Sequence, residues 1–199
     1  MTFRLLLAAL VSGLATVGAA SAFARAPEAG EVACQAPPAA IEANNKLGFK
    51  EFDQSDAIAY TPWWLSDRRC FAEAARVSEL YLLFGPELSE REKDVVTWHM
   101  AQNLAYAGRE DQAGALMAST RRPPEVEPDQ FDWNSYLVGT WSFLVKDRPR
   151  LEAARAKLVA SPGQRNAINA ATLGRLLRCF DRSYDEAIHA KACAAEPAR

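Results

Sequence analysis

The stretch NLAYAGREDQAGALM, Asn103–Met117, places one glycine between two segments that are rich in small and apolar residues. A helix often ends at glycine, because glycine adopts the left-handed backbone conformation without a steric penalty. Gly108 is therefore expected to have a positive φ and to form a turn. Ala113 is small enough to let a second helix approach the first closely. The stretch predicts an antiparallel helix hairpin.

The first helix of this hairpin has a recognisable start. In PELSEREKDVV, Ser89 precedes Glu92 by three residues, the capping-box pattern that satisfies free amides at a helix N-terminus. Apolar residues then recur at three- and four-residue spacing, as one buried helix face requires. They are Val95, Val96, Met100, Leu104 and Ala107. A second helix is expected from about Glu110, with Leu116 and Met117 facing the first.

Turn-like positions recur along the chain at similar intervals. They are Arg69, Gly108, Asp147 and Arg182, which stand 39, 39 and 35 residues apart. An aromatic-x-Glu-Ala pattern follows the first and the last of them, at Phe71–Ala74 and Tyr184–Ala187, and Pro149 suits the first turn of a helix. Evenly spaced hairpins are typical of an α-solenoid, in which each hairpin buries its apolar face against its neighbours. The sequence predicts an all-α fold of about four stacked antiparallel hairpins.

This pattern resembles the tetratricopeptide repeat family over residues 60–190. If Gly108 is the turn glycine of that repeat, Ala101 and Leu104 occupy its small and large positions on the first helix. Ala113 and Met117 then occupy the corresponding positions on the second helix. Tetratricopeptide proteins hold peptides or partner proteins in a concave groove, so the resemblance implies an interaction module and not an enzyme.

The chain also departs from this family. Trp98 stands one position late for the family tryptophan, and Asp147 and Arg182 replace the turn glycine in two copies. The segment FDWNSYLVGTWSFLVKDRPRLEAARAKL is similar to a stretch in bacterial exported proteins of unknown function, which implies no particular activity.

The N-terminal residues predict export. Arg4 precedes an uncharged apolar run, Leu5–Val17, and small residues suited to cleavage follow near residues 22–26. The run is shorter than the roughly 20 apolar residues that cross a bilayer. We therefore expect a secretory signal peptide over residues 1–26, a single helical-repeat domain over 27–193 and a disordered tail over 194–199. The protein is then exported to the periplasm or the extracellular space, without stable membrane insertion.

Charge and cysteines narrow the chemistry further. The formal net charge is -2 and no basic cluster occurs, so we do not expect nucleic-acid binding. An even number of cysteines in an exported chain favours disulfides, and four cysteines allow three pairings. Sequence proximity favours Cys34 with Cys70 and Cys179 with Cys193. The alternatives, a nucleophilic thiol or a metal site, lack the C-x-x-C spacing that would support them.

No catalytic motif is present. The sequence contains neither H-E-x-x-H, nor G-x-S-x-G, nor a phosphate loop, nor a dinucleotide-binding glycine pattern. We therefore expect a non-catalytic protein without cofactor or metal. The alternative is a small-ligand-binding protein or enzyme that uses a pocket near His99 and Trp133, since histidine titrates near neutral pH. The interpretation that we favour for His99 is a hydrogen-bonded histidine of the core or groove.

In the interaction-module interpretation, the working surface is the inner face formed by the first helices of successive hairpins. The expected contact residues for a peptide or protein partner are Gln102, Asn103 and Tyr106 on the second hairpin, and Asn134 and Tyr136 on the third. Amides and tyrosines suit this role because they hydrogen-bond an extended chain without demanding one charge. The alternative is that these are ordinary solvated or half-buried positions.

Overall fold

The computed structural model describes residues 34–123 and 131–194, and over these residues the fold is entirely helical. Ten α-helices and one short 3-10 helix follow one another, and no strand occurs within these two ranges. They are α1 (Pro38–Asn44), α2 (Phe49–Asp53), α3 (Pro62–Asp67), α4 (Phe71–Phe84), α5 (Glu90–Tyr106), α6 (Glu110–Ser119), α7 (Trp133–Leu144), α8 (Arg148–Ala160), α9 (Gln164–Arg178), α10 (Tyr184–His189) and η1 (Lys191–Cys193). The predicted all-α class is confirmed.

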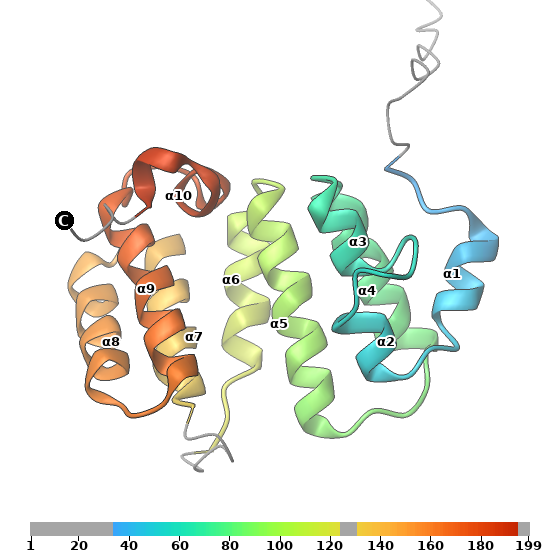
Figure 1. Cartoon of the computed structure of the whole chain (residues 1–199), viewed down its shortest axis with the longest axis horizontal. Coiled ribbons are helices and arrows are strands. Elements are labelled where there is room, and N and C mark those ends of the chain that lie inside the picture. The colour runs from blue at the N-terminus through green and yellow to red at the C-terminus, as the bar shows by residue number, and fades with distance from the viewer. Residues whose placement is uncertain (1–33, 124–130, 195–199) are drawn as a thin grey trace, which may run out of the picture. The chain divides into compact units, whose positions relative to one another are not determined.

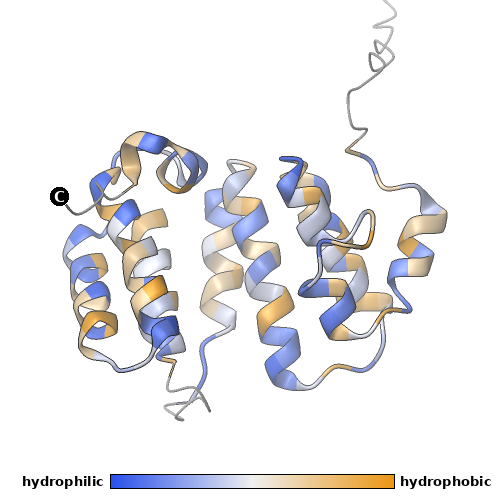
Figure 2. Cartoon of the chain, in the orientation of Figure 1, coloured by the Kyte–Doolittle hydropathy of each residue, from blue (hydrophilic) through white to orange (hydrophobic). Residues whose placement is uncertain are grey.

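Consecutive helices from α3 to α9 pack against one another, and α10 packs on both α9 and α5 (Figure 1). Individual helices contain both hydrophilic and hydrophobic residues, as α5 and α8 show in Figure 2. In the described part of the chain, no helix has the length and apolarity needed to cross a membrane.

Three of the helix pairs, α3–α4, α5–α6 and α7–α8, are joined by the same kind of turn. The residue two positions after each first helix has a positive φ, namely 59° at Arg69, 77° at Gly108 and 57° at Lys146. The next amide then donates to the carbonyl five residues earlier. These hydrogen bonds are Cys70 N to Leu65 O (2.9 Å), Arg109 N to Leu104 O (2.9 Å) and Asp147 N to Ser142 O (2.8 Å). This is the Schellman ending of a helix, used three times.

The turns predicted at Arg69 and Gly108 are thus found, and two others need correction. The left-handed residue of the third turn is Lys146, whereas Asp147 is the N-cap of α8 and its carboxylate accepts from the Arg150 amide at 3.1 Å. Arg182 lies in a longer connection between α9 and α10 without a left-handed residue. The fourth connection therefore differs from the other three.

Gly108 offers a direct test of this turn. A Cβ built on Gly108 would meet no atom within 4 Å, so replacing it with valine introduces backbone strain without a side-chain clash. We expect Gly108→Val to lower the free energy of unfolding by about 1 kcal/mol or more, because the left-handed conformation is unfavourable for β-branched residues. Gly108→Asn is the matched control, since asparagine tolerates this conformation. Equal stability of the two variants in urea denaturation would contradict the assignment.

The largest apolar cluster lies mainly among α5 to α10, and two smaller clusters are formed by residues between Ala36 and Val96. Small residues allow the helices to approach closely. Ala113 is fully buried on α6, and a Cβ built on Gly139 of α7 would lie 2.3 Å from Leu173 Cδ1 of α9. A larger residue at position 139 would therefore require the buried Leu173 side chain or the helices themselves to shift.

Two disulfides hold the ends of the described chain. Cys34 is bonded to Cys70, the N-cap of α4, and Cys179 is bonded to Cys193, which closes a loop around α10. This is the pairing that sequence proximity favours, and no cysteine is left free. Two disulfides point to an oxidising, exported environment. The predicted signal peptide over residues 1–26 and most of the predicted tail, residues 195–199, lie outside the described residues.

Candidate functional site

Two adjoining hollows lie along one side of α5. The first, the arginine hollow, has a volume of about 340 Å³ and reaches from α2 across α5 to α7 and α9. Its lining includes Phe49, Arg91, Trp98, Arg122, Trp133 and Arg165. The second, the aspartate hollow, has a volume of about 320 Å³ and reaches from α3 across α5 to α10. Its lining includes Asp53, Trp63, Asp67, Phe71, Tyr106 and His189.

His99 and Gln102 line both hollows, so the two adjoin at these side chains, and we call them together the groove. The α5 residues that line this groove recur at intervals of one to four positions, as expected for one broad helix face. They are Arg91, Val95, Trp98, His99, Gln102, Asn103 and Tyr106. From Arg91 to Tyr106 the helix axis rises about 22 Å, at 1.5 Å per residue. The groove is therefore long compared with a single side chain.

His99 stands at the middle of the groove and is oriented by a buried carboxylate. Its Nδ1 lies 3.0 Å from Asp53 Oδ1 and 2.9 Å from Oδ2. The Asp53 side chain is fully buried, while that of His99 is 33% exposed. Gln54 Nε2 also donates to the Asp53 carboxylate. Because Nδ1 is engaged by Asp53, Nε2 is the ring nitrogen that remains for a ligand.

This arrangement differs from a serine–histidine–aspartate triad. Ser66 lines the aspartate hollow together with His99, but its Oγ is bonded elsewhere. It lies 2.8 Å from the Pro62 carbonyl oxygen and 2.6 Å from Asn103 Oδ1. Activation of a serine needs a hydrogen bond to the histidine base, which the structure does not place here.

Buried tyrosines from three helices support the floor of the groove. The Gln102 amide donates to Tyr136 Oη at 3.5 Å and to Tyr184 Oη at 3.2 Å. Burial raises the pKa of Tyr136 and Tyr184, and neighbouring tyrosine hydroxyls raise both values further. Burial likewise raises the pKa of Tyr106. These hydroxyls stay protonated at neutral pH, so the floor of the groove is polar and uncharged.

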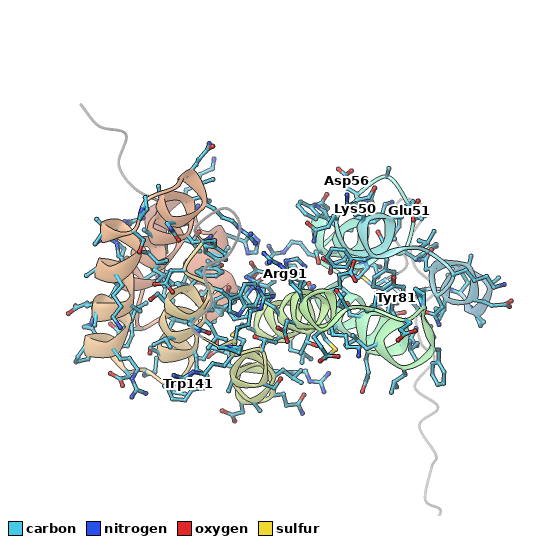
Figure 3. All side chains as sticks on the ribbon, turned by 90° about the horizontal axis from the view of Figure 1, so that it is seen from below. Lys50, Glu51, Asp56, Tyr81, Arg91 and Trp141 are labelled. Atoms are coloured by element: carbon cyan, nitrogen blue, oxygen red, sulfur yellow. A yellow bond between two sulfur atoms is a disulfide. The ribbon has the colours of Figure 1, made fainter. Side chains whose placement is uncertain are left out.

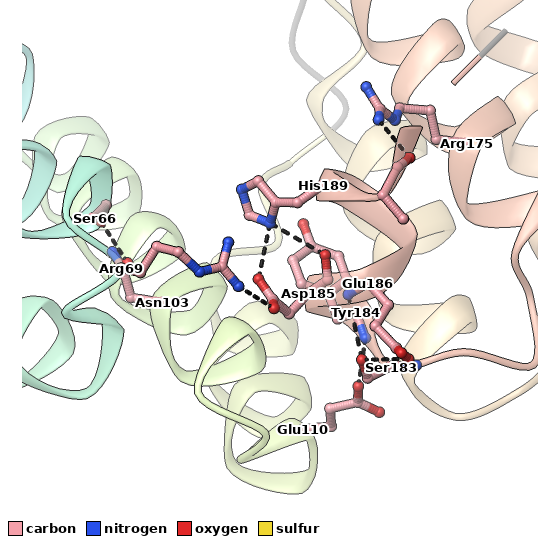
Figure 4. A network of polar contacts seen from close by, with 11 residues as sticks. Ser66, Arg69, Asn103, Glu110, Arg175, Ser183, Tyr184, Asp185, Glu186 and His189 are labelled. Carbon is pink, nitrogen blue, oxygen red and sulfur yellow. Dashed lines mark hydrogen bonds and ion pairs between the residues drawn. The ribbon is translucent and has the colours of Figure 1, made fainter. Parts of the chain in front are cut away.

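Helix α10 lies at the aspartate end of the groove and is held there by polar contacts (Figure 4). Asp185 forms an ion pair with Arg69 of the α3–α4 turn, and its other carboxylate oxygen lies 2.8 Å from His189 Nδ1. Glu110 of α6 accepts from the Tyr184 amide at 2.7 Å. The contacts therefore join α10 to two hairpin turns and position His189 beside the aspartate hollow.

The two hollows are lined by different charged residues. Arg91, Arg122 and Arg165 line the arginine hollow, and Figure 3 shows Arg91 on the side of α5 where α2 also lies. The Arg122 guanidinium is paired with Asp94 at 2.9 Å and lies 3.9 Å from the centre of the Trp133 ring. Two carboxylates, Asp53 and Asp67, line the aspartate hollow. A ligand that spans the groove meets arginines at one end and aspartates at the other.

No protein-family model, curated protein or solved structure matches the chain. Within residues 34–123 and 131–194, no group of three or more His, Cys, Asp and Glu side chains is placed to hold a metal ion. The groove must therefore be interpreted from its own residues.

The structure brings four of the five expected partner-binding residues to the groove. Gln102, Asn103 and Tyr106 line the aspartate hollow, and Gln102 and Tyr136 line the arginine hollow. Asn103 is nevertheless almost buried, and its amide donates to the His99 carbonyl oxygen at 3.0 Å. His99 and Trp133 both line the arginine hollow, where the alternative interpretation expected a pocket.

Asn134 has a different place. Its Nδ2 donates to the Arg122 carbonyl oxygen at 2.8 Å, and its Oδ1 accepts from the Arg122 amide at 3.1 Å. It lines neither hollow and fastens the backbone after α6 to the start of α7. These two hydrogen bonds give Asn134 a structural role at the start of α7.

Three groove residues were not expected from the sequence. Asp53 lies 46 residues before His99, and no local pattern links the two. Trp63 follows a helix-starting proline, which marks the helix start but not the face that lines a groove. His189 is far from His99 in sequence, and no local pattern indicates that both line one hollow.

Proposed function

We propose that this protein is an exported interaction module, acting in the periplasm or the extracellular space, that holds an extended peptide segment in the groove along α5. The observation that carries the proposal is the pair of adjoining hollows, which are lined along about 22 Å of one helix face. At about 3.3 Å per residue, an extended chain of six or seven residues fits that length. A small metabolite would occupy one hollow and leave the other empty.

The lining of the groove is consistent with peptide recognition. Aromatic rings supply apolar contact at low entropic cost, and amides and hydroxyls can bond a peptide backbone of any sequence. Trp133, Trp63 and Gln102 represent these two kinds of group. We further propose that the hairpins form a tetratricopeptide-like stack, in which α3, α5 and α7 are the first helices and form the inner face. The identical turns of three hairpins support this arrangement.

Gln102→Lys tests the groove, because Gln102 is half-buried and lines both hollows. The longer, charged side chain of the introduced lysine should obstruct the groove, while its ammonium group can still donate to the tyrosine hydroxyls. We expect the native protein to enrich members of a random heptapeptide display library. The variant should bind the enriched peptides at least about tenfold more weakly, equivalent to the loss of about 1.4 kcal/mol.

Thr97→Lys is the matched control, since Thr97 is also half-buried on α5 but lines neither hollow. It should bind the peptides like the native protein. Unchanged binding by Gln102→Lys, with a native circular dichroism spectrum, would place the function outside the groove.

The Asp53–His99 pair favours one second candidate, a hydrolase in which His99 activates water. A buried carboxylate that orients the ring of a half-exposed histidine is an arrangement that general bases use. A panel of ester and peptide substrates tests this candidate. Turnover that is lost in His99→Gln but kept in Gln102→Lys would favour the enzyme over the interaction module.

A further inference from the structure

Trp63 and Asp67 form the outer wall of the aspartate hollow. They lie one helical turn apart on α3, so their side chains project from the same side of the helix. Trp63 is 47% exposed. The neighbouring Trp64 differs, because its ring contacts Tyr60 at 4.9 Å between centroids and lies 3.9 Å from the Arg68 guanidinium. Trp64 therefore packs against neighbouring residues of the protein, whereas Trp63 lines the hollow.

The Asp67 carboxylate is exposed and forms no hydrogen bond or ion pair with another described residue. No lysine or arginine is among the described residues that line this hollow. Arg69 is close, 5.1 Å from the centre of the Phe71 ring, but its guanidinium is paired with Asp185. The other carboxylate of the lining, that of Asp53, is fully buried and contacts His99. Asp67 is therefore the carboxylate of this lining that a cation in the hollow can reach.

Building on the proposed function, we propose that the aspartate hollow binds a lysine or arginine side chain of the peptide. The cationic group lies over the Trp63 ring and pairs with Asp67. An aromatic face attracts a cation through its quadrupole, and the nearby carboxylate adds a charge-assisted hydrogen bond. The aliphatic part of the side chain packs against the rings of Phe71 and Tyr106 on the other side of the hollow.

A small cation tests the hollow independently of any peptide. Nα-acetyl-lysine methylamide is titrated into ¹⁵N-labelled protein while the indole N–H signal of Trp63, assigned with Trp63→Phe, is followed by NMR. We expect saturable shifts of this signal with the lysine compound and none with the norleucine analogue, which keeps the four-carbon chain but lacks the ammonium group. Asp67→Asn should raise the dissociation constant about threefold or more.

Asp111→Asn is the matched control, because Asp111 is an exposed carboxylate of α6 that lines neither hollow. It should leave the titration unchanged. Equal shifts with the lysine and norleucine compounds, or an unchanged dissociation constant in Asp67→Asn, would overturn the cation site.

Peptides distinguish this inference from the proposed function on which it rests. Heptapeptides enriched by the native protein should contain lysine or arginine at a fixed position, and their binding should weaken as salt is added. Asp67→Asn should remove this preference. If enriched peptides show no basic position, the groove function stands and the cation site fails. If the lysine compound binds but no peptide is enriched, the cation site stands and the peptide groove fails.

Discussion

Replacing His99 with alanine is expected to lower the free energy of unfolding by about 3 kcal/mol at pH 7. The fully buried Asp53 side chain would lose the partner that contacts both of its oxygens, and among the described residues Gln54 would be the remaining side-chain donor. Removing the hydrogen-bond partner of a buried polar group costs about 1–3 kcal/mol. We expect the upper end of this range, because the Asp53 side chain is fully buried.

Asp53→Asn separates the buried charge from the lost packing. An asparagine keeps an acceptor for the His99 ring without a buried charge, so we expect it to cost about 1 kcal/mol, the net value of one hydrogen bond. The double variant His99→Ala/Asp53→Asn should lose about 1 kcal/mol or more less unfolding free energy than the sum of the losses in the two single variants. Urea denaturation with unchanged m-values measures all three. Strict additivity would mean that His99 and Asp53 are not coupled.

Local signals in the sequence predicted the parts of the fold that local interactions determine. The capping box at the start of α5 is present, because Ser89 Oγ accepts from the Glu92 amide at 3.3 Å and the Glu92 carboxylate accepts from the Ser89 amide at 2.9 Å. Gly108 has the positive φ that glycine at a helix end indicates. In these cases, the residues that cause the structure lie within a few positions of one another.

Tertiary contacts explain where the sequence placed a turn wrongly. Lys146 is left-handed although lysine has no special preference for that conformation. Its ammonium donates to the carbonyl oxygens of Phe180 at 3.0 Å and Arg182 at 2.9 Å, and it lies 3.9 Å from the centre of the Phe143 ring. The hydrogen bonds to Phe180 and Arg182, which are more than thirty positions away, hold the turn. A helix-cap pattern read along the sequence could not contain them.

The candidate site also has a part that the sequence predicts and a part that only the folded chain shows. Helical periodicity was sufficient to place Gln102, Asn103 and Tyr106 on one face of α5, and that face lines the groove. It could not supply the opposite walls, because Asp53 and His189 come from elements that only the folded chain brings to α5. The grouping of arginines in one hollow and aspartates in the other is likewise a property of the assembled groove.

Removing the Cys34–Cys70 disulfide is expected to lower the free energy of unfolding by about 4 kcal/mol, the largest effect that we predict. The bond joins residues 36 positions apart, and in the chain-entropy model a loop of that length is worth about 4 kcal/mol, compared with about 3 kcal/mol for a loop of 15 residues. The bond also keeps the Ala36 amide beside Glu73 Oε1, at 2.7 Å, and it joins a small apolar cluster that contains Leu65 and Val77. Loss of the bond should therefore affect α1 and α3 first.

The double variant Cys34→Ser/Cys70→Ser tests this expectation, and Cys179→Ser/Cys193→Ser is the matched control. Because Cys179 and Cys193 are only 14 residues apart, the control should lose about 3 kcal/mol and not 4. Denaturation curves give both values. When the unmutated protein is denatured without a reducing agent, thiol titration should detect no thiol. Two thiols per unmutated chain would contradict the pairing. A greater loss in the control would mean that the α10 segment, rather than loop length, determines how much each bond stabilises the protein.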